Sequence, residues 1–146
     1  MHICRMVSVL LTLLCARTAV CQSTGFTGTW QQVGLTDQTR VEKIEVRDSL
    51  VVVSYDARAA ISSASGTIEY RTDGSEIYQN TAAWKKWTTA SWQGPTLLIS
   101  TIRLQNGMVT ATREIWTLSA ESTLTKARRT VSEHGVREET LVFQRQ

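Results

Sequence analysis

The chain has 146 residues, a formal net charge of +3 and three cysteines, and 42% of its residues are hydrophobic. Its length suits one domain of ordinary size, and so small a charge excludes the basic composition typical of nucleic-acid-binding proteins. All three cysteines fall within the first 21 residues, so the rest of the chain has neither a disulfide framework nor thiol chemistry.

The first residues, MHICRMVSVLLTLLCARTAVCQS, have the features of an export signal. Arg5 gives a positive start, residues 6–16 form a short apolar run, and Ala19 and Cys21 are small residues at positions −3 and −1 of a cut after Cys21. The apolar run has 11 residues, well short of the roughly 20 that span a bilayer. We predict a signal peptide over residues 1–21. An uncleaved membrane helix and a lipoprotein anchor on Cys21 are the alternatives.

Cleavage leaves residues 22–146 as a single domain of 125 residues, with 14 basic and 13 acidic side chains. The basic character of the whole chain therefore comes mostly from the leader, and no nucleic-acid partner is predicted. Neither Asn80 nor Asn106 lies in a glycosylation sequon. With the missing disulfides, these features indicate a bacterial exported protein, periplasmic or secreted, without a membrane anchor after cleavage.

Beyond the leader, short runs rich in Val, Ile, Thr, Tyr and Trp alternate with turn residues, and no amphipathic helix stands out. Asp73-Gly74 and Asn106-Gly107 are hairpin dipeptides, and Pro95, the only proline, falls at a break. The spacing favours an antiparallel barrel or sandwich over a parallel sheet. The predicted strands are 26–33, 39–47, 50–55, 65–71, 75–79, 84–92, 96–104, 108–118, 123–131 and 136–144.

The predicted hairpins determine which residues face one another across neighbouring strands. A two-residue Asp73-Gly74 loop sets Arg71 opposite Glu76 and Tyr70 opposite Ile77. The loops at Asn106-Gly107 and at SEHG (132–135) give apolar and opposite-charge pairs: Leu104–Val109, Ile102–Ala111, Leu98–Ile115, Arg129–Glu138, Arg128–Glu139, Leu124–Phe143 and Lys126–Leu141. Strand 108–118 is apolar on both faces, so either both are covered near one end or a bulge switches them. The face that carries Arg113, Glu114 and Arg128 stays open.

The segment GFTGTWQQVG at 25–34 resembles the first strand of calycin-type barrels, the lipocalins and avidins, which carries Gly-x-Trp. The resemblance implies that Gly28 and Trp30 close one end of the barrel. It also implies an arginine from a late strand over the tryptophan, with Arg113, Arg128 and Arg129 as candidates. The polar residues with which avidins hold biotin are not matched, so biotin binding is not predicted.

Further motifs extend the resemblance over nearly the whole mature chain. They are YRTDGSE at 70–76, SWQG and TLLIS within 91–100, EIWTLSAES from 114 and the final LVFQRQ. Together they are similar to small exported bacterial proteins with a lipocalin-like barrel, a largely uncharacterised group. The resemblance implies an all-β, antiparallel up-and-down barrel of about 8–10 strands.

Catalytic and metal sites find little support in the sequence. After cleavage His134 is the only histidine, in a turn, and no cysteine remains as a nucleophile or zinc ligand. Glu138 and Glu139 are adjacent on a strand, so they point to opposite faces and cannot form a carboxylate dyad. We predict a protein that is not an enzyme and has no cofactor and no metal.

Two segments are candidates for ligand binding. In AAWKKWTTASW at 82–92, Trp84 and Trp92 share one strand face and Trp87 lies on the other. These tryptophans either stack on a flat ligand such as a sugar or fill the core and an edge. Arg113 and Arg128 belong to a charged group on the late strands. That group either lines the barrel and holds an acidic head group or forms an ion-pair ladder outside.

The sequence therefore predicts an exported, non-enzymatic lipocalin-like barrel that binds a small apolar or amphipathic ligand. The candidate ligand-binding residues are Trp84, Trp87, Trp92, Arg113 and Arg128. The alternatives are a protein-interaction module, such as a periplasmic inhibitor or envelope accessory domain, and a carbohydrate-stacking module. An apolar cavity of roughly 300 Å³ or more favours a small ligand, whereas a filled interior with an exposed tryptophan patch favours a protein partner.

Overall fold

The computed structural model describes residues 25–119 and 122–146, which form ten strands joined in one antiparallel sheet. Each strand overlaps one of the ten ranges predicted from the sequence. The predicted signal peptide and its cleavage site lie outside the described residues. The strands are β1 (Gly28–Gln32), β2 (Gln38–Arg47), β3 (Leu50–Ala59), β4 (Ser62–Arg71), β5 (Ile77–Asn80), β6 (Trp84–Gln93), β7 (Thr96–Gln105), β8 (Met108–Ser119), β9 (Thr123–Ser132) and β10 (Gly135–Arg145).

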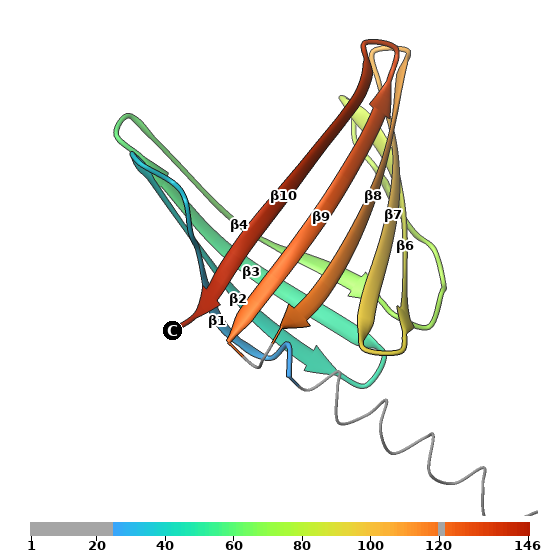
Figure 1. Ribbon diagram of the computed structural model, residues 1–146. Coiled ribbons are helices and arrows are strands. Elements are labelled where there is room, and N and C mark those ends of the chain that lie inside the picture. Colours follow the sequence, from blue (N-terminus) through green and yellow to red (C-terminus); the bar gives the residue numbers. More distant parts are fainter. Residues whose placement is uncertain (1–24, 120–121) are drawn as a thin grey trace, which may run out of the picture.

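The strands run up and down around the molecule in the spatial order β4-β3-β2-β1-β10-β9-β8-β7-β6-β5 (Figure 1). The first and last strands pair, with Trp30 opposite Arg145 and Gln32 opposite Phe143. The predicted all-β, antiparallel up-and-down barrel is confirmed, and β4 and β5 are its two edges. Within the part of the chain that the structure describes, there is no helix with the length and apolar character needed to cross a membrane.

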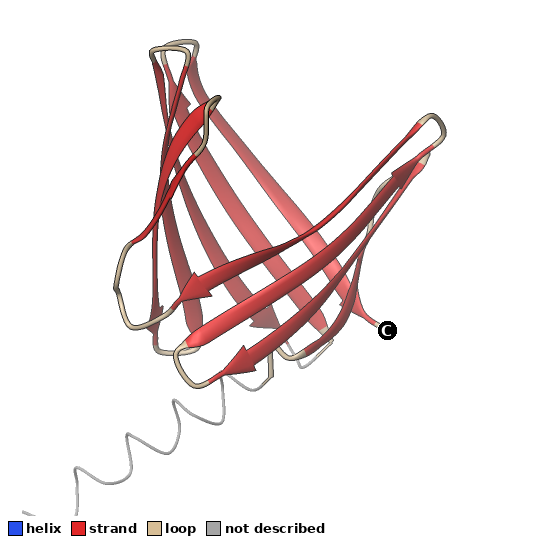
Figure 2. Ribbon diagram, turned by 180° about the vertical axis from the view of Figure 1, so that it is seen from behind, coloured by secondary structure: helices blue, strands red, loops and turns tan. Residues whose placement is uncertain are grey.

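The two edge strands leave a seam in the barrel. At one end a β-bridge joins Asp73 to Ser91, and Gly74 N–H donates to Ala90 O at 3.2 Å. From this end the walls formed by β1–β4 and β6–β10 diverge (Figures 1 and 2). We call the end near the Asp73 turn the closed end and the end near the Asn106 turn the open end.

The predicted register across Asp73-Gly74 is wrong. Tyr70 pairs with Val51 of β3, and Ile77 of β5 pairs with Thr88 of β6. The Asp73 carboxylate accepts a hydrogen bond from Ser75 N–H at 2.9 Å, and Gly74 has a φ of 82°. These residues do form a turn, as such residues tend to. The turn leads the chain across the seam to the opposite wall instead of back along β4.

The registers predicted for the two later hairpins are confirmed. Leu104 pairs with Val109 across Asn106-Gly107, whose φ angles of 52° and 79° are those that a type I′ turn requires. Across the next turn, Arg128 pairs with Glu139 as expected.

Strand β8 contains no bulge, since its pairing with β7 and β9 continues without interruption. Trp116 therefore faces the core, where it is 2% exposed, while Val109 and Ile115 face outward and are exposed. The apolar residues on both faces of this strand reflect a filled interior at one end and an uncovered outer surface.

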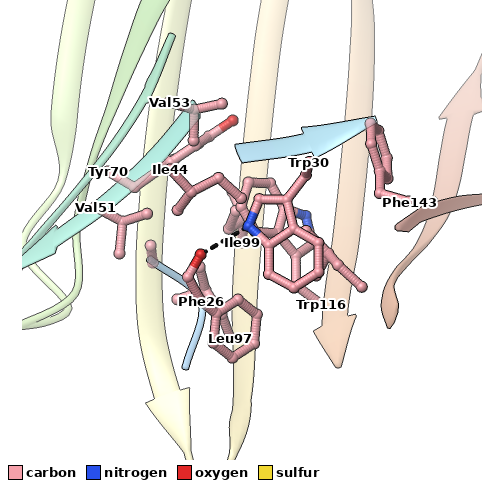
Figure 3. Packing of buried hydrophobic residues seen from close by; sticks show 12 residues of the cluster. Phe26, Trp30, Ile44, Val51, Val53, Tyr70, Leu97, Ile99, Trp116 and Phe143 are labelled. Atoms are coloured by element: carbon pink, nitrogen blue, oxygen red, sulfur yellow. Dashed lines mark hydrogen bonds between the residues drawn. The ribbon is translucent and has the colours of Figure 1, made fainter. Parts of the chain in front are cut away.

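The hydrophobic core lies at the closed end (Figure 3). Its largest fully buried members are Trp30, Trp116, Phe26 and Phe143. The indole N–H of Trp30 donates to Phe26 O at 2.9 Å, so the only polar atom of this side chain is satisfied inside the core. The rest of the cluster is Ile44, Val51, Val53, Tyr70, Ala90, Leu97, Ile99 and Leu124.

Arg145, from the end of β10, lies over Trp30. Its guanidinium carbon is 4.5 Å from the centroid of the indole ring, and Nη1 donates to Thr27 O at 3.0 Å. The arginine over Trp30 is therefore Arg145, and the three candidates named from the resemblance lie elsewhere. A Cβ atom on Gly28 would be 2.9 Å from Arg145 Nη1, and Gly28 has a φ of 153°. Glycine thus lets the guanidinium approach the backbone.

Replacing Gly28 by alanine is expected to lower the free energy of unfolding by about 1–3 kcal/mol, because side-chain-bearing residues rarely adopt this φ. The added methyl group also displaces the Arg145 guanidinium. Thr29→Ala, at the next position of β1, changes neither feature and is the control. Urea denaturation of both variants measures the difference. Equal midpoints would contradict the conclusion that the backbone at position 28 requires glycine.

Candidate functional site

Strand alternation defines the inner face of the barrel. Because Trp116, Leu124 and Phe143 are buried in the core, every second residue from them along β8, β9 and β10 also faces inward. The inward residues are apolar at the closed end and charged in the middle. Toward the open end they are small or polar on β3 and β4 and include Trp84, Lys86 and Arg103 on β6 and β7. The charged layer consists of Arg40, Glu42, Glu114, Lys126, Arg128, Arg137 and Glu139.

A buried ion pair lies at the centre of this layer. The side chains of Glu42 and Lys126 are 1% and 4% exposed, and the ammonium group donates to Glu42 Oε2. The other carboxylate oxygen accepts a hydrogen bond from Arg40 Nε at 2.9 Å. Lys126 Nζ also lies 3.6 Å from the centroid of the Trp116 ring. Each buried charge thus has two favourable contacts, which offset the cost of removing it from water.

Further ion pairs extend the layer toward β10. Glu114 accepts hydrogen bonds from Trp116 Nε1 at 2.8 Å and from Arg128 Nε at 3.2 Å. Arg128 Nη1 donates to Glu139 Oε1 at 2.9 Å, and the second Glu139 oxygen lies 3.3 Å from Arg137 Nη2. The network covers the apolar core on its open side and links β8, β9 and β10.

Burial lowers the pKa of Lys126 below the ordinary lysine value of 10.5, and the neighbouring Glu42 carboxylate opposes this shift. Glu42 therefore favours the charged form of the lysine inside the barrel. The buried charge of each residue therefore depends on the presence of the other.

A cavity of about 350 Å³ lies on the open side of the charged layer. Small side chains of β3 and β4, including Ala57 and Ala64, form one wall, and Arg128 and Leu141 lie on the other. The small residues leave this space empty at a level of the barrel where larger ones would fill it. The remaining lining residues are Gln32, Leu35, Gln38, Thr39, Arg40, Arg58, Ala59, Ser62, Ser63 and Glu139.

The structure separates the three predicted tryptophans. Trp92 packs edge-on against Phe26 with ring centroids 5.1 Å apart, beside the core. Trp84 is on the same strand face at the open end, and Trp87 is on the outer face, where its ring centroid lies 5.2 Å from that of Tyr78. They form no common stacking surface, and their roles in ligand binding stay predictions.

The two predicted arginines lie on opposite faces of the sheet. Arg128 faces inward, within the ion-pair network and the lining of the cavity. Arg113 faces outward, opposite Arg129 across the strand pair, and lies at the edge of two outer hollows of about 570 and 270 Å³. The sequence alone left open which face of the sheet carries Arg113, Glu114 and Arg128. Strand alternation places Glu114 on the inner face together with Arg128.

Sequence reasoning missed the residues that build the centre of the site. Glu42 and Lys126 are the buried pair, and Arg40 supports it. A signal was present, because Lys126 lies two residues from Leu124 and Glu42 two residues from Ile44, so alternation places each charge next to an apolar residue on the same strand face. A charged residue in such a pattern indicates a buried ionic partner.

In residues 25–119 and 122–146, no group of three or more His, Cys, Asp or Glu side chains is arranged to hold a metal ion. The side chain of His134 is 81% exposed in the β9–β10 turn and lies 3.5 Å from Glu133. The described residues thus offer no histidine inside the cavity for acid–base chemistry.

The strand order and the pairing of the first and last strands give the chain a lipocalin-like barrel fold. No protein-family model matches the sequence, and no curated protein matches it. Solved structures share the fold. Human cRBP IV is 12% identical, with a TM-score of 0.51 over 83% of this chain and 98% of that chain. The fatty-acid-binding protein of Manduca sexta is 10% identical, with a TM-score of 0.50 over 83% of this chain and 99% of its own.

Two further solved structures with this fold have names that indicate different roles. The S-type phycobiliprotein lyase CPES of Guillardia theta is 11% identical, with a TM-score of 0.55 over 93% of this chain and 97% of the lyase. A secretory abundant heat soluble protein of Ramazzottius varieornatus is 8% identical, with a TM-score of 0.55 over 84% and 96% of the two chains. At these identities the likeness is one of fold.

Replacing Glu42 by glutamine is expected to lower the free energy of unfolding by about 3–5 kcal/mol, because it leaves the Lys126 charge buried without its carboxylate. Without Glu42 the folded pKa of Lys126 falls further, so the folded state holds fewer protons on this group than the unfolded state does. The penalty is therefore present at neutral pH and decreases as the pH rises toward 10.5.

Urea denaturation at neutral pH and near pH 10 measures both effects. Glu45→Gln is the control, because Glu45 lies on the same strand and pairs with the exposed Lys43 and Arg47. Equal losses in the two variants, or a Glu42→Gln loss that does not shrink at high pH, would contradict the buried-pair interpretation.

Proposed function

We propose that this chain is an exported, non-enzymatic barrel that binds a small apolar or amphipathic ligand in the open half of its interior. The observation that carries the proposal is the cavity of about 350 Å³ above the charged layer. This volume lies within the range of roughly 300–1,000 Å³ usual for small-molecule sites. The ligand lies above the ion-pair network, because the apolar core already fills the closed end.

The lining suits a ligand with both apolar and polar parts. Ala57, Ala64 and Leu141 supply apolar contact, while Arg40 and Arg128 supply donors on the side of the charged layer. A wholly apolar ligand would remove the exposed parts of these charged groups from water and offer them no hydrogen bond in return, which is costly. An amphipathic molecule, with an apolar part and hydrogen-bond acceptors, suits this lining better.

Three further observations support the proposal. The barrels with the same fold include a fatty-acid-binding protein. Export is proposed from the leader sequence alone, and the absence of enzymatic activity from the lack of an interior histidine among the described residues.

Replacing Ala57 by tryptophan is expected to weaken ligand binding at least tenfold, because the indole ring occupies the space between the two walls of the cavity. The measurement is displacement of a fluorescent fatty-acid analogue by alcohols and acids of increasing chain length. Ser54→Trp, on the outward face of the same strand, is the control and retains binding. Absence of binding by the unchanged protein would contradict the proposed function. So would equal affinity in both variants.

One observation favours a second candidate function, association with a protein partner. On the outer face a continuous cross-strand row of mostly apolar residues crosses β5 to β10. Its members Tyr78, Ile102, Val131 and Val136 are 43–57% exposed. Contiguous exposed apolar surface is a feature of protein-binding sites. The full row is Tyr78, Trp87, Ile102, Ala111, Val131 and Val136.

If this row binds a protein, the double variant Ile102→Lys, Val131→Lys is expected to abolish a stoichiometric partner seen by native mass spectrometry of the protein purified from its envelope fraction. The reason is that two added charges cannot be desolvated in an apolar interface. Thr117→Lys, also outward but nearer the closed end, is the control. A monomeric mass for the unchanged protein would count against this second function.

A further inference from the structure

Two cations face each other on the inner wall near the open end. Lys86 of β6 is directly opposite Arg103 of β7. Both side chains face inward, because Lys86 shares its strand face with the buried Ala90 and Arg103 shares its face with the buried Ile99. Like charges directly opposite on neighbouring strands are destabilising. Packing alone therefore does not explain why two cations are opposite each other at this position.

Neither cation has an ion-pair partner among the described residues, although inward carboxylates exist. Glu42, Glu114 and Glu139 are engaged by other cations deeper in the barrel. Apart from Arg145 at the closed end, the inner face of the described strands thus carries twice as many cations as carboxylates, with the surplus toward the open end. The cations are Arg40, Lys86, Arg103, Lys126, Arg128 and Arg137.

Both cations lie close to the indole ring of Trp84. Lys86 Nζ lies 5.6 Å and Arg103 Cζ 5.4 Å from the centroid of the indole ring. Such cation–π contacts position the two charges without neutralising them. Partial burial lowers the pKa of Lys86, and the Arg103 charge lowers it further. A bound anion opposes both effects.

Two neutral side chains complete the row. Gln79 is opposite Lys86 on one side and Thr110 is opposite Arg103 on the other. The inward row therefore presents an amide, an ammonium, a guanidinium and a hydroxyl group in register. The guanidinium fork binds two oxygens of one group, and the ammonium binds one of the same oxygens or, in a phosphate or sulfate, a third. Carboxylate, phosphate and sulfate groups share this chemistry.

We propose that Trp84, Lys86 and Arg103 form a subsite for the anionic head group of an amphiphile whose apolar part lies in the barrel interior. This subsite is separate from the buried network around Glu42, because no ion pair joins the two within the described residues. The proposal rests on the proposed ligand-binding function and adds to it the position and the charge of the head group.

The test compares three probes with the same tail: decanoate, decyl phosphate and decanol, each measured by isothermal titration calorimetry. In the unchanged protein the two anions are expected to bind roughly tenfold or more tightly than decanol, as charge-assisted hydrogen bonds would give. The double variant Lys86→Gln, Arg103→Gln is expected to lose this preference and to keep its affinity for decanol. Lys85→Gln is the matched control, because Lys85 is the adjacent, outward-facing and exposed lysine of the same strand.

The outcomes separate this subsite from the proposed function. Binding of decanol with no preference for the anions would overturn the subsite and leave the ligand-binding function standing. A preference that survives in the double variant would also overturn it, since the head group then binds elsewhere. Failure of all three probes to bind the unchanged protein would overturn both proposals. Inorganic phosphate alone is a fourth probe, and affinity equal to that of decyl phosphate would overturn the role of the tail.

Discussion

The ion pair between Glu42 and Lys126 joins two strands whose paired residues are 84 positions apart in the sequence. Because both charges are buried, neither is stable there without the other, so the pair fixes how the β2 wall and the β9 wall meet. A slip of one residue in either strand would turn one charge to the outside and leave its partner buried in the interior without a counter-ion. Lys126 Nζ also lies 4.9 Å from the Phe143 ring centroid, so the pair rests directly on the core.

This arrangement divides the barrel into two halves with different properties. Below the pair, the aromatic side chains around Trp30 fill the space, and the ordered contacts of Arg145 close the end. Above it, alanine and serine residues on β3 and β4 leave a hollow between the diverging walls. Stability and the proposed ligand binding thus depend on different parts of the same strands. We therefore expect substitutions at the open end to leave the packing of the core unchanged.

The sequence predicted the architecture well and the site only in part. Turn dipeptides and strand alternation gave all ten strands and two of three hairpin registers, because those features are local. The Asp73-Gly74 register failed because whether a turn returns along the same strand or crosses a seam depends on the distant Ser91. The buried Glu42 was missed for the same reason: its partner is near only in the folded chain. Arg113 was grouped with Arg128 in sequence, yet alternation places them on opposite faces.

The seam between β4 and β5 has one more consequence, which concerns solubility. An unpaired strand edge is a template on which another chain can add, and such edges are where β-proteins begin to form fibrils. In β4 the exposed stretch from Ser62 to Thr67 is made of serine, alanine, glycine and threonine. These small side chains offer too little apolar surface to hold an incoming strand, and glycine and alanine are depleted in strands. The composition that leaves room inside the barrel also makes its open edge a poor nucleus for aggregation.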